Sequence, residues 1–364
     1  MAEIGVIFGG LSPEHDISVL SGLQAARVLQ SSGHRVTCLF WSKTGQWWRV
    51  PTESEGRAFL EPKIEGASEV TLTVPGGFSE QRRMRSQALE FDAVVNCCHG
   101  GPGEDGSLTA LLRLAGVRVT GPAPDGAALA MDKYATAAIA AQIGVDTIPT
   151  RLIESAGDLP FPWVVKPRFG GSSLGVTAGV RDLDTAKALA QQGVARAGCL
   201  VQPHLEGWID LNIAVRRTPA IEVSAIERPV RDDAAILDYK AKYLRGSEGM
   251  ETTPREVPAN IPEPIAVRIR SMAVAIVEAF GLTGIPRIDF LWDGADRVLL
   301  CEVNSIPGAM GLYLWEAAGV SRAKVLDDLV AEAQRGPLHP AQWSASSDGA
   351  ALRVANTIAA KLAL

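Results

Sequence analysis

Two short segments late in the chain carry polar residues at the spacing of a β-strand face. Residues 287–289 read Arg-Ile-Asp and residues 302–304 read Glu-Val-Asn, so the first and third residue of each segment share a face if both are strands. Pairing of the two strands would bring Asp289, Glu302 and Asn304 together. Three oxygen donors without Cys or His suit Mg²⁺ or Mn²⁺ better than zinc. The alternative is a half-buried hairpin whose polar residues face water.

Two lysines and a glycine-rich loop could bind phosphate groups. Lys133 lies at a helix turn, and Lys166 ends the apolar segment 163–165. The loop 170–175 reads Gly-Gly-Ser-Ser-Leu-Gly, and its backbone N–H groups and hydroxyls could close over phosphates beside the lysine charges. Each feature is common by itself, and their order along the chain favours a phosphate site.

A second glycine motif supports a different hypothesis. Residues 101–106 match G-x-G-x-x-G after a strand-like segment, the spacing of a dinucleotide-binding loop. Asp125 follows near where a ribose-binding acid is expected. Pro102 removes an amide donor, however, and Glu104 would repel a pyrophosphate. An NAD-dependent oxidoreductase is therefore the weaker hypothesis.

Segments typical of strands and helices alternate along the chain. Strand-like segments 4–8, 35–41 and 91–98 alternate with helical ones, which predicts an N-terminal parallel sheet of the doubly wound type. Residues 127–144 predict one Ala-rich helix, and the glycine loop joins two predicted strands as a hairpin or flap. Further strands are expected at 200–202, 211–216, 288–292 and 298–303, with a helix at 265–280.

Length and composition narrow the class of protein. A chain of 364 residues predicts two or three domains, and 35 basic against 41 acidic residues exclude a strongly basic nucleic-acid binder. The 5 cysteines, an odd number without C-x-x-C spacing, fit a reducing compartment. No signal peptide is visible, and Asp132 and Lys133 interrupt the most apolar stretch. We expect a cytoplasmic protein that acts on small molecules, without a nucleic-acid or membrane partner.

Several motifs together resemble the D-alanine–D-alanine ligase branch of the ATP-grasp enzymes over residues 4–330. The matching stretches, in chain order, are 8–15, 99–106, 131–133, 165–175, 241–243, 287–289 and 302–308. The resemblance implies an ATP-grasp fold of α/β and α+β class, in which two domains clasp ATP beside the N-terminal sheet domain. We expect domains at 1–124 (first substrate), 125–210 (central lid) and 211–335 (catalytic), followed by a linker and terminal helix at 336–364.

The same resemblance implies an activity and a set of residue roles. An amino-acid carboxylate would be activated by ATP as an acyl phosphate and joined to an amine, with release of ADP and phosphate. Glu14 would bind the ammonium group of the first amino acid with help from Ser172 and Tyr243, while Arg287 and the Gly308 amide would stabilise the acyl phosphate and the oxyanion. Further substrate contacts are implied for His99, Glu104 and Tyr313. Nucleotide contacts are implied for Lys133, Lys166, Ser173, Gln202, Leu205, Asp210 and Lys242, and Mg²⁺ ligation for Asp289, Glu302 and Asn304. The family also suggests a homodimer.

The chain departs from the family pattern in ways that concern the substrates. Gln202 stands where family members commonly carry glutamate, and Asp210 fits the ribose position only with one inserted residue. Tyr313 lies near the position of the serine that binds the second substrate's carboxylate, so we expect a rebuilt acceptor pocket. Tyr243, where D-lactate-using relatives carry histidine, favours an amine acceptor.

The expected activity is therefore D-alanyl-D-alanine-type dipeptide synthesis or that of a relative with a different acceptor. The alternatives are the oxidoreductase, a specialised natural-product amide ligase of the same fold, and an ATP-binding module without catalysis.

Overall fold

The N-terminal sheet has seven strands, and only part of it is parallel. The computed structural model describes residues 1–82, 85–230, 254–336, 349 and 352–353. The strand order is β6-β5-β4-β3-β2-β1-β7. β1 (Glu3–Gly9), β2 (Arg35–Trp41) and β7 (Ala93–Asn96) run parallel, as predicted.

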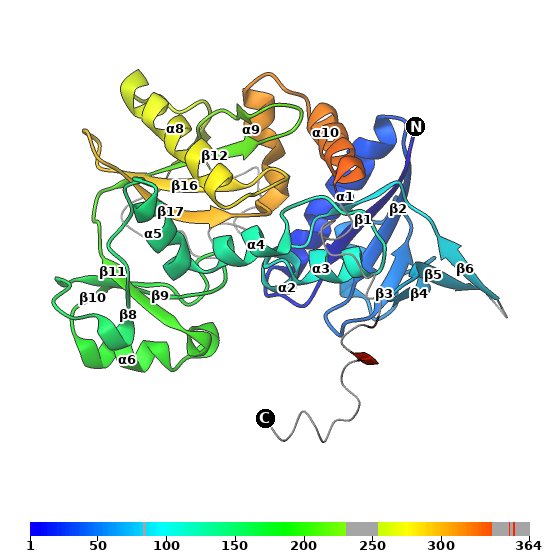
Figure 1. Ribbon diagram of the computed structural model, residues 1–364, viewed down its shortest axis with the longest axis horizontal. Helices are drawn as coiled ribbons and strands as arrows, with labels where there is room; N and C mark the ends of the chain where they lie inside the picture. Colours follow the sequence, from blue (N-terminus) through cyan, green and yellow to red (C-terminus); the bar gives the residue numbers. More distant parts are fainter. Residues whose placement is uncertain (83–84, 231–253, 337–348, 350–351, 354–364) are drawn as a thin grey trace.

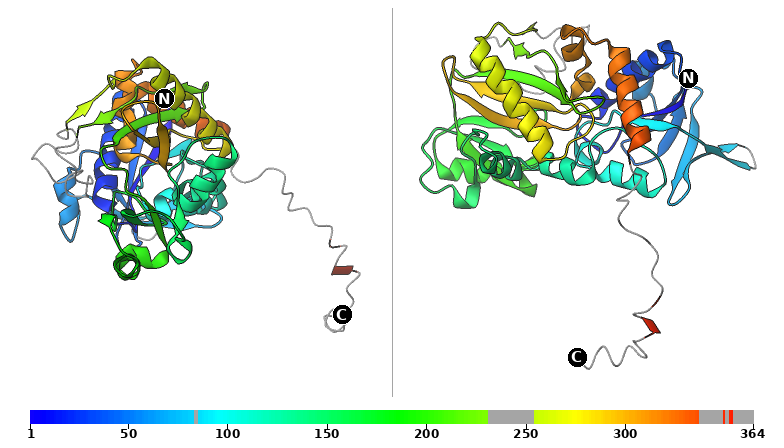
Figure 2. Two further views of the ribbon diagram at one scale, coloured as in Figure 1. Left: turned by 90° about the vertical axis from the view of Figure 1, so that its left-hand side faces the viewer. Right: turned by 45° about the horizontal axis from the view of Figure 1, so that its top comes forward.

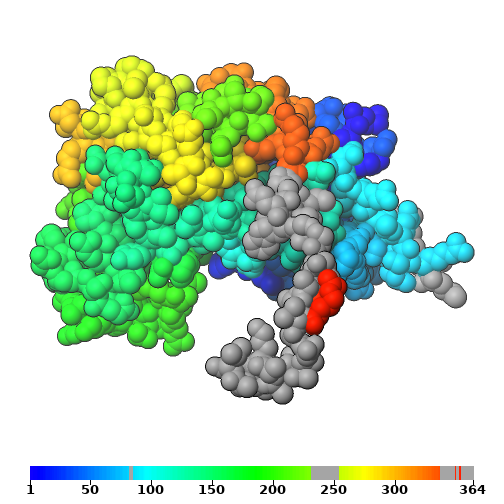
Figure 3. Space-filling model, in the orientation of Figure 1, coloured from blue at the N-terminus to red at the C-terminus, as the bar shows by residue number. Residues whose placement is uncertain are grey.

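The segment between β2 and β7 adds antiparallel strands to the predicted parallel sheet. Its strands are β3 (Trp47–Val50), β4 (Ser68–Thr73), β5 (Gly77–Arg82) and β6 (Arg85–Leu89), and they pair antiparallel. The links from β2 to β3 and from β4 to β5 are short, and a short turn joins only antiparallel strands. The hairpin of β5 and β6 projects from the body of the molecule (Figures 1 and 3).

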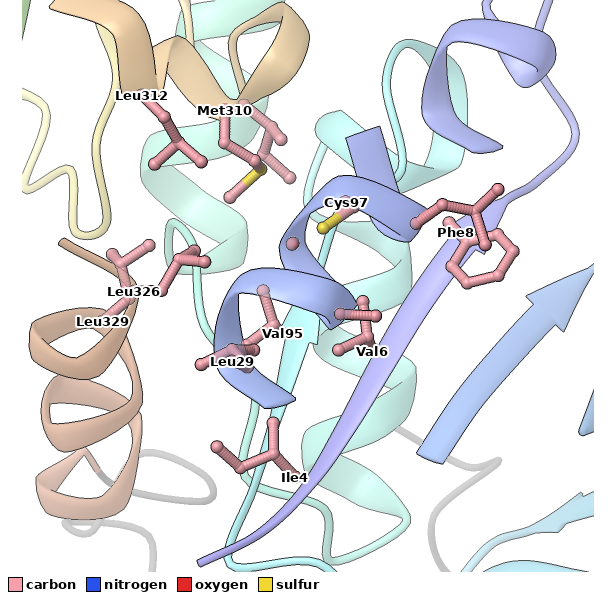
Figure 4. Packing of buried hydrophobic residues seen from close by; sticks show 14 of the residues in the cluster. Ile4, Val6, Phe8, Leu29, Val95, Cys97, Met310, Leu312, Leu326 and Leu329 are labelled. Carbon is pink, nitrogen blue, oxygen red and sulfur yellow. The ribbon is translucent and has the colours of Figure 1, made fainter. Parts of the chain in front are cut away.

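The hydrophobic core on one face of this sheet includes helices from the C-terminal part of the chain. On one face, α1 (His15–Ser31) covers β1, and α10 (Arg322–Arg335) packs beside α1. Figure 4 shows Val6 and Leu29 in one cluster with Leu326 and Leu329. The turn η5 (Gly308–Gly311) and α9 (Leu312–Ala317) join the same cluster. Residues between Ile306 and Ala333 therefore share a hydrophobic core with the first strand of the protein.

The middle sheet carries the glycine loop. Its order is β10-β9-β11-β8, all antiparallel, with β8 at Arg151–Leu152, β9 at Trp163–Pro167, β10 at Thr177–Val180 and β11 at Cys199–Pro203. The predicted hairpin of β9 and β10 is confirmed. Helix α6 (Leu183–Ala190) packs on β9. In Figures 1 and 2 this sheet and α6 lie below the C-terminal sheet and α8.

The C-terminal sheet carries the predicted acidic segments. Its order is β13-β12-β16-β17, with β12 at Ile209–Arg216, β13 at Glu222–Val223, β16 at Arg287–Trp292 and β17 at Val298–Asn304. Helix α8 (Glu263–Ala279) shares its apolar core. A separate pair is formed by β14 (Arg228–Pro229) and β15 (Arg255–Glu256). The boundary expected after residue 210 falls inside β12.

The prediction of a single helix at 127–144 is wrong. The structure has α4 (Pro124–Met131) and α5 (Lys133–Gln142), separated by Asp132 in an extended conformation. The Asp132 carboxylate accepts hydrogen bonds from the amides of Tyr134 and Ala135 and caps α5. An aspartate at the N-cap position begins a new helix despite the continuous alanine-rich composition.

The remaining short elements are connectors. They are α2 (Gly101–Glu104), α3 (Ser107–Leu114), η1 (Gly56–Leu60), η2 (Ile153–Ser155) and η3 (Gly193–Ala197). Within the described residues, no helix has the length and apolar character needed to cross a membrane.

The close approach of α1 to β1 depends on a glycine. A Cβ atom added to Gly22 would lie 2.3 Å from Cδ1 of Phe8, which is fully buried. We therefore expect Gly22→Ala to lower the free energy of unfolding by about 1–3 kcal/mol through overpacking, although alanine is the better helix former. Urea unfolding measures the change. Gln30→Ala, exposed on the same helix, should change it by less than about 0.5 kcal/mol. Equal stability of the Gly22→Ala protein would refute the packing.

Candidate active site

A cavity of about 980 Å³ lies between the middle and C-terminal sheets. It is lined by side chains from β9, β11, β12, β16 and β17, by the glycine loop, and by the turn η5 with α9. Most residues predicted to bind nucleotide, metal or substrate line it: Lys133, Lys166, Ser173, Gln202, Leu205, Asp210, Arg287, Asp289, Glu302, Gly308 and Tyr313.

A second, much smaller cavity adjoins the first. Its volume is about 40 Å³, and it shares Lys133, Arg287, Glu302 and Gly308 with the larger one. Its other lining includes the predicted residues Glu14, His99, Glu104, Ser172 and Asn304. Lys242 and Tyr243 lie outside the described residues.

The acidic segments pair as the sequence predicts. Asp289 lies opposite Glu302 and Arg287 opposite Asn304 in the register of β16 and β17. The Asn304 amide Nδ2 donates to Asp289 Oδ2 at 2.9 Å. Two carboxylates and an amide therefore lie at one end of the two strands.

Arg287 forms a two-point ion pair with Asp289. Its Nε donates to Oδ1 at 2.6 Å and its Nη2 donates to Oδ2 at 2.7 Å. Burial acts to lower the pKa of Arg287, but the Asp289 carboxylate outweighs it and raises that pKa well above its ordinary value. The guanidinium stays charged within a largely desolvated site.

The two lysines bring positive charge to the acidic cluster. Lys133 Nζ lies 3.9 Å from Glu302 Oε2 and donates to the backbone oxygen of Gly170. Burial lowers the pKa of Lys133, Glu302 opposes this effect, and the neighbouring charge of Lys166 adds to it. Lys166, on β9, is itself buried. The two ammonium groups thus lie in electrostatic range of each other, an arrangement that a bound anion would stabilise.

The glycine loop reaches across to the N-terminal sheet. The Ser172 hydroxyl donates to the Glu14 carboxylate, which lies at the start of α1, and both side chains are buried. Ser172 and Ser173 have positive φ angles of 52° and 57°, a conformation that non-glycine residues rarely adopt. At the base of the loop, Arg168 Nε donates to Asp132 at 2.8 Å.

The motif 99–106 is folded around its own glutamate. Glu104 Oε2 accepts from the Gly100 amide at 2.9 Å, and Oε1 accepts from the Ile306 amide at 3.3 Å. Burial, then the charge of Glu14, raises the pKa of Glu104 to about 7. The Gly100 amide of the turn therefore already donates to a carboxylate of the protein. This geometry lends no support to pyrophosphate binding by the motif.

His99 lies between two other segments of the chain, and its hydrogen bonds to them require a single tautomer. Its Nδ1 lies 3.0 Å from the Ile306 carbonyl and its Nε2 lies 2.7 Å from the Ser21 hydroxyl. A carbonyl only accepts, so Nδ1 carries the proton and Nε2 accepts from Ser21. Burial lowers the pKa of His99 to about 4. The imidazole is therefore neutral at pH 7 and fixes the position of residues 306–309.

Gln202 and Asp210 also line the large cavity. Gln202, buried on β11, donates through Nε2 to Thr150 Oγ1 at 2.7 Å. This bond orients the carboxamide, so that its oxygen is the atom left to accept from a ligand. Asp210 on β12 and Leu205 line the same cavity.

The sequence analysis missed several polar residues that line the cavity. Asn212, two positions after Asp210, shares its face on β12, so the alternation used for residues 287–289 would have found it. Glu227, Arg255 and Arg322 also line the cavity. They come from separate elements with no local pattern, and no signal in the sequence singles them out.

Comparisons with known proteins agree over nearly the whole chain. The family "D-ala D-ala ligase N-terminus" matches residues 3–122, and "D-ala D-ala ligase C-terminus" matches residues 137–331. The D-alanine–D-alanine ligase of Deinococcus radiodurans is 31% identical, with 90% of this chain and 97% of that protein covered. The ligase of Sodalis glossinidius is 29% identical, with 90% and 94% covered.

Solved structures share the fold. The VanG D-Ala:D-Ser ligase from Enterococcus faecalis has a TM-score of 0.74 at 24% identity, covering 91% of this chain and 99% of that one. The D-alanine–D-alanine ligase from Helicobacter pylori has a TM-score of 0.72 at 24% identity, covering 93% and 100%. From the two family matches and the full-length relatives, the chain belongs to the D-alanine–D-alanine ligase family of ATP-grasp fold.

Proposed function

We propose that this protein is an ATP- and Mg²⁺-dependent ligase that joins two amino acids into a dipeptide of the D-alanyl-D-alanine type. The observation that carries the proposal is that two lysines, the Arg287–Asp289 pair and the Glu302 carboxylate line one and the same cavity. The positive charges there are complementary to phosphate groups and to an activated carboxyl, and the carboxylates are complementary to a divalent cation. Family membership supports the same activity.

The proposed reaction has two steps. An oxygen of the first amino acid's carboxylate attacks the γ-phosphorus of ATP, the bond to the bridging oxygen breaks, and ADP leaves. The amine nitrogen of the second amino acid then attacks the acyl carbon, loses a proton, and expels inorganic phosphate. Negative charge develops on the transferring phosphoryl group and then on the acyl oxygen, so Arg287 and the Gly308 amide are proposed to stabilise both.

The donor set at the ends of β16 and β17 fits a hard divalent cation. Asp289 and Glu302 supply carboxylates, and Asn304, whose Nδ2 is used toward Asp289, keeps its Oδ1 for a metal. Mg²⁺ held there would neutralise charge on the phosphates of the nucleotide. We propose Lys133 and Lys166 as partners of the α- and β-phosphates, and Gln202, Leu205 and Asp210 as contacts of the nucleoside.

The buried acids at the start of α1 and in the motif 99–106 would receive the first amino acid. Glu14, with Ser172 bound to it, is proposed to bind the substrate ammonium, and Glu104 and His99 hold the surrounding backbone. The glycine loop then covers the site and excludes water, which would otherwise hydrolyse the acyl phosphate.

Other features of the protein stay predictions. They are the division at residues 124, 210 and 335, the roles of Lys242, Tyr243 and Ser173, a homodimer, and a cytoplasmic location.

Phosphate release with Mg-ATP tests the proposal. We expect release that depends on amino acids when D- and L-amino acids are offered singly and in pairs, with ADP and a dipeptide formed in equal amounts. Phosphate release without dipeptide, or none with any pair, would contradict it.

Arg287→Lys is expected to lower kcat for ligation at least a hundredfold, about 2.7 kcal/mol or more of transition-state stabilisation. Lysine keeps the charge but loses the two-point geometry. ATP affinity, measured by calorimetry, should change less than about threefold. Arg270→Lys on the exposed face of α8 serves as the matched control. A large loss of ATP affinity would place Arg287 in nucleotide binding.

The raised pKa of Glu104 predicts a pH-dependent stability. Between the ordinary value of 4.5 and about 7, the unfolded chain releases this proton while the native state keeps it. The contribution of Glu104 to stability is therefore complete below pH 4.5 and is lost as the pH rises through 7. Glu104→Gln cannot titrate, so from pH 5 to 8 its unfolding free energy relative to wild type should rise by on the order of 2 kcal/mol. Urea unfolding at each pH measures the difference. If the unfolding free energies of wild type and Glu104→Gln changed with pH in the same way, the raised pKa of Glu104 would be contradicted.

A further inference from the structure

The wall of the large cavity includes a polar cluster that the proposed function leaves unused. It consists of Glu227, which directly precedes β14, Arg255 on β15, and Tyr313 on α9. Tyr313 lies near the position where the sequence departs from the family's serine. The cluster therefore occupies the part of the site that we expected to be rebuilt.

Glu227 is the buried centre of the cluster. Its Oε2 accepts from the Tyr313 hydroxyl at 2.8 Å and from Asn212 Nδ2 at 3.2 Å, and its Oε1 lies 3.5 Å from Arg255 Nη1. Its backbone also exchanges two hydrogen bonds with Asn212 of β12. Both carboxylate oxygens thus have partners within the protein, so Glu227 is suited to hold its neighbours in place rather than to bind a substrate amine.

Tyr313 keeps its proton in this setting. Burial, then the charge of Glu227, raises the pKa of the Tyr313 hydroxyl above its ordinary value. The hydroxyl is therefore a permanent donor to Glu227, and the ring stays fixed beneath the guanidinium of Arg255, whose Cζ lies 4.6 Å from the ring centroid. A carboxylate at one edge and an aromatic face below hold the guanidinium at the cavity wall.

This cluster lies within electrostatic range of the proposed reaction centre. The charge of Glu227 acts on the pKa of Arg287, and Arg287 and Gly308 line the cavity together with Arg255. Arg287 itself is committed to Asp289 through two hydrogen bonds. A second substrate placed for attack beside Arg287 would meet the guanidinium of Arg255.

We propose that Arg255 binds the carboxylate of the second amino acid and so determines the choice of acceptor, with Glu227 and Tyr313 as positioning residues. The inference rests on the proposed ligase function. A planar guanidinium matches a carboxylate with two parallel hydrogen bonds. The acceptor class that this site favours is therefore an amino acid with a free carboxylate, in preference to an amine without one.

Arg322, which also lines the cavity, is the competing candidate for binding the carboxylate. Its Nε lies 2.7 Å from Glu316 Oε2, and it begins α10 at the surface. Its partner Glu316 is largely exposed, whereas Arg255 is held by the buried Glu227 and by the ring of Tyr313. The geometry favours Arg255.

An amino acid and its carboxamide give a direct test. D-alaninamide has no carboxylate to be activated, so it acts only as acceptor, and the same holds for the carboxamide of any amino acid that the phosphate assay identifies. With the first amino acid saturating, the wild-type protein should use the acceptor amino acid with kcat/KM about tenfold or more above that of its carboxamide.

Substitutions in the cluster test acceptor binding, and the KM values of ATP and of the carboxamide show whether the rest of the site is intact. Arg255→Gln should raise the KM of the amino acid tenfold or more, leave the KM of ATP and of the carboxamide within about twofold, and abolish the preference between them. Arg255→Lys should retain part of the preference. Tyr313→Phe, which loses the hydroxyl that orients Glu227, should raise the acceptor KM severalfold with little effect on the KM of ATP.

Arg228 is the matched control, because it lies in the same strand pair, contacts Glu256 at 3.9 Å and does not line the cavity. Arg228→Gln should behave as wild type. The inference is overturned if Arg255→Gln affects amino acid and carboxamide equally, or if only Arg322→Gln removes the preference. Absence of amino-acid-dependent phosphate release by the wild-type protein would instead overturn the proposed ligase function.

Discussion

The ion pair between Arg287 and Asp289 is the interaction on which the rest of the site depends. A guanidinium withdrawn from water needs a carboxylate partner, because an unpaired buried charge is strongly destabilising. Here the pair is formed within one strand, at positions 287 and 289, with Asn304 of the neighbouring strand completing the contacts of Asp289. The same carboxylate serves as counter-charge to Arg287 and as a proposed metal ligand, so binding of a cation and orientation of the arginine are coupled. Both are placed by the register of β16 and β17.

Segments distant in sequence surround this ion pair because they share a hydrophobic core and hydrogen bonds. Residues between Ile306 and Ala333 share a core with α1 and β1, so the turn at Gly308 lies on the core of the N-terminal sheet. His99, neutral and bonded to Ser21 and Ile306, links that core to the reaction centre. The glycine loop approaches from the middle sheet and bonds Glu14 through Ser172. A substrate bound at this junction would touch all three sheets, which is how binding could drive closure and the exclusion of water.

Local patterns predicted most of these elements, and their failures have physical causes. Alternation over residues 287–289 and 302–304 was sufficient to predict the acidic cluster, because strand periodicity fixes which side chains share a face. The break at Asp132 was missed, since the N-cap role of one aspartate was hidden within an alanine-rich run. The antiparallel half of the N-terminal sheet was also missed, because residues 52–90 show no clear period. The Glu227–Arg255–Tyr313 cluster could not be predicted at all: its members meet only through tertiary packing.

The proposed mechanism requires that the carboxylate of the first substrate is activated as an acyl phosphate. Transfer of a carboxylate oxygen to phosphate is the signature of that step. With the first amino acid labelled with ¹⁸O in its carboxylate, each turnover should place one labelled oxygen in the released inorganic phosphate, because the carbon–oxygen bond to that atom breaks when the amine attacks. Phosphate free of label, or formation of AMP and pyrophosphate in place of ADP, would contradict the account.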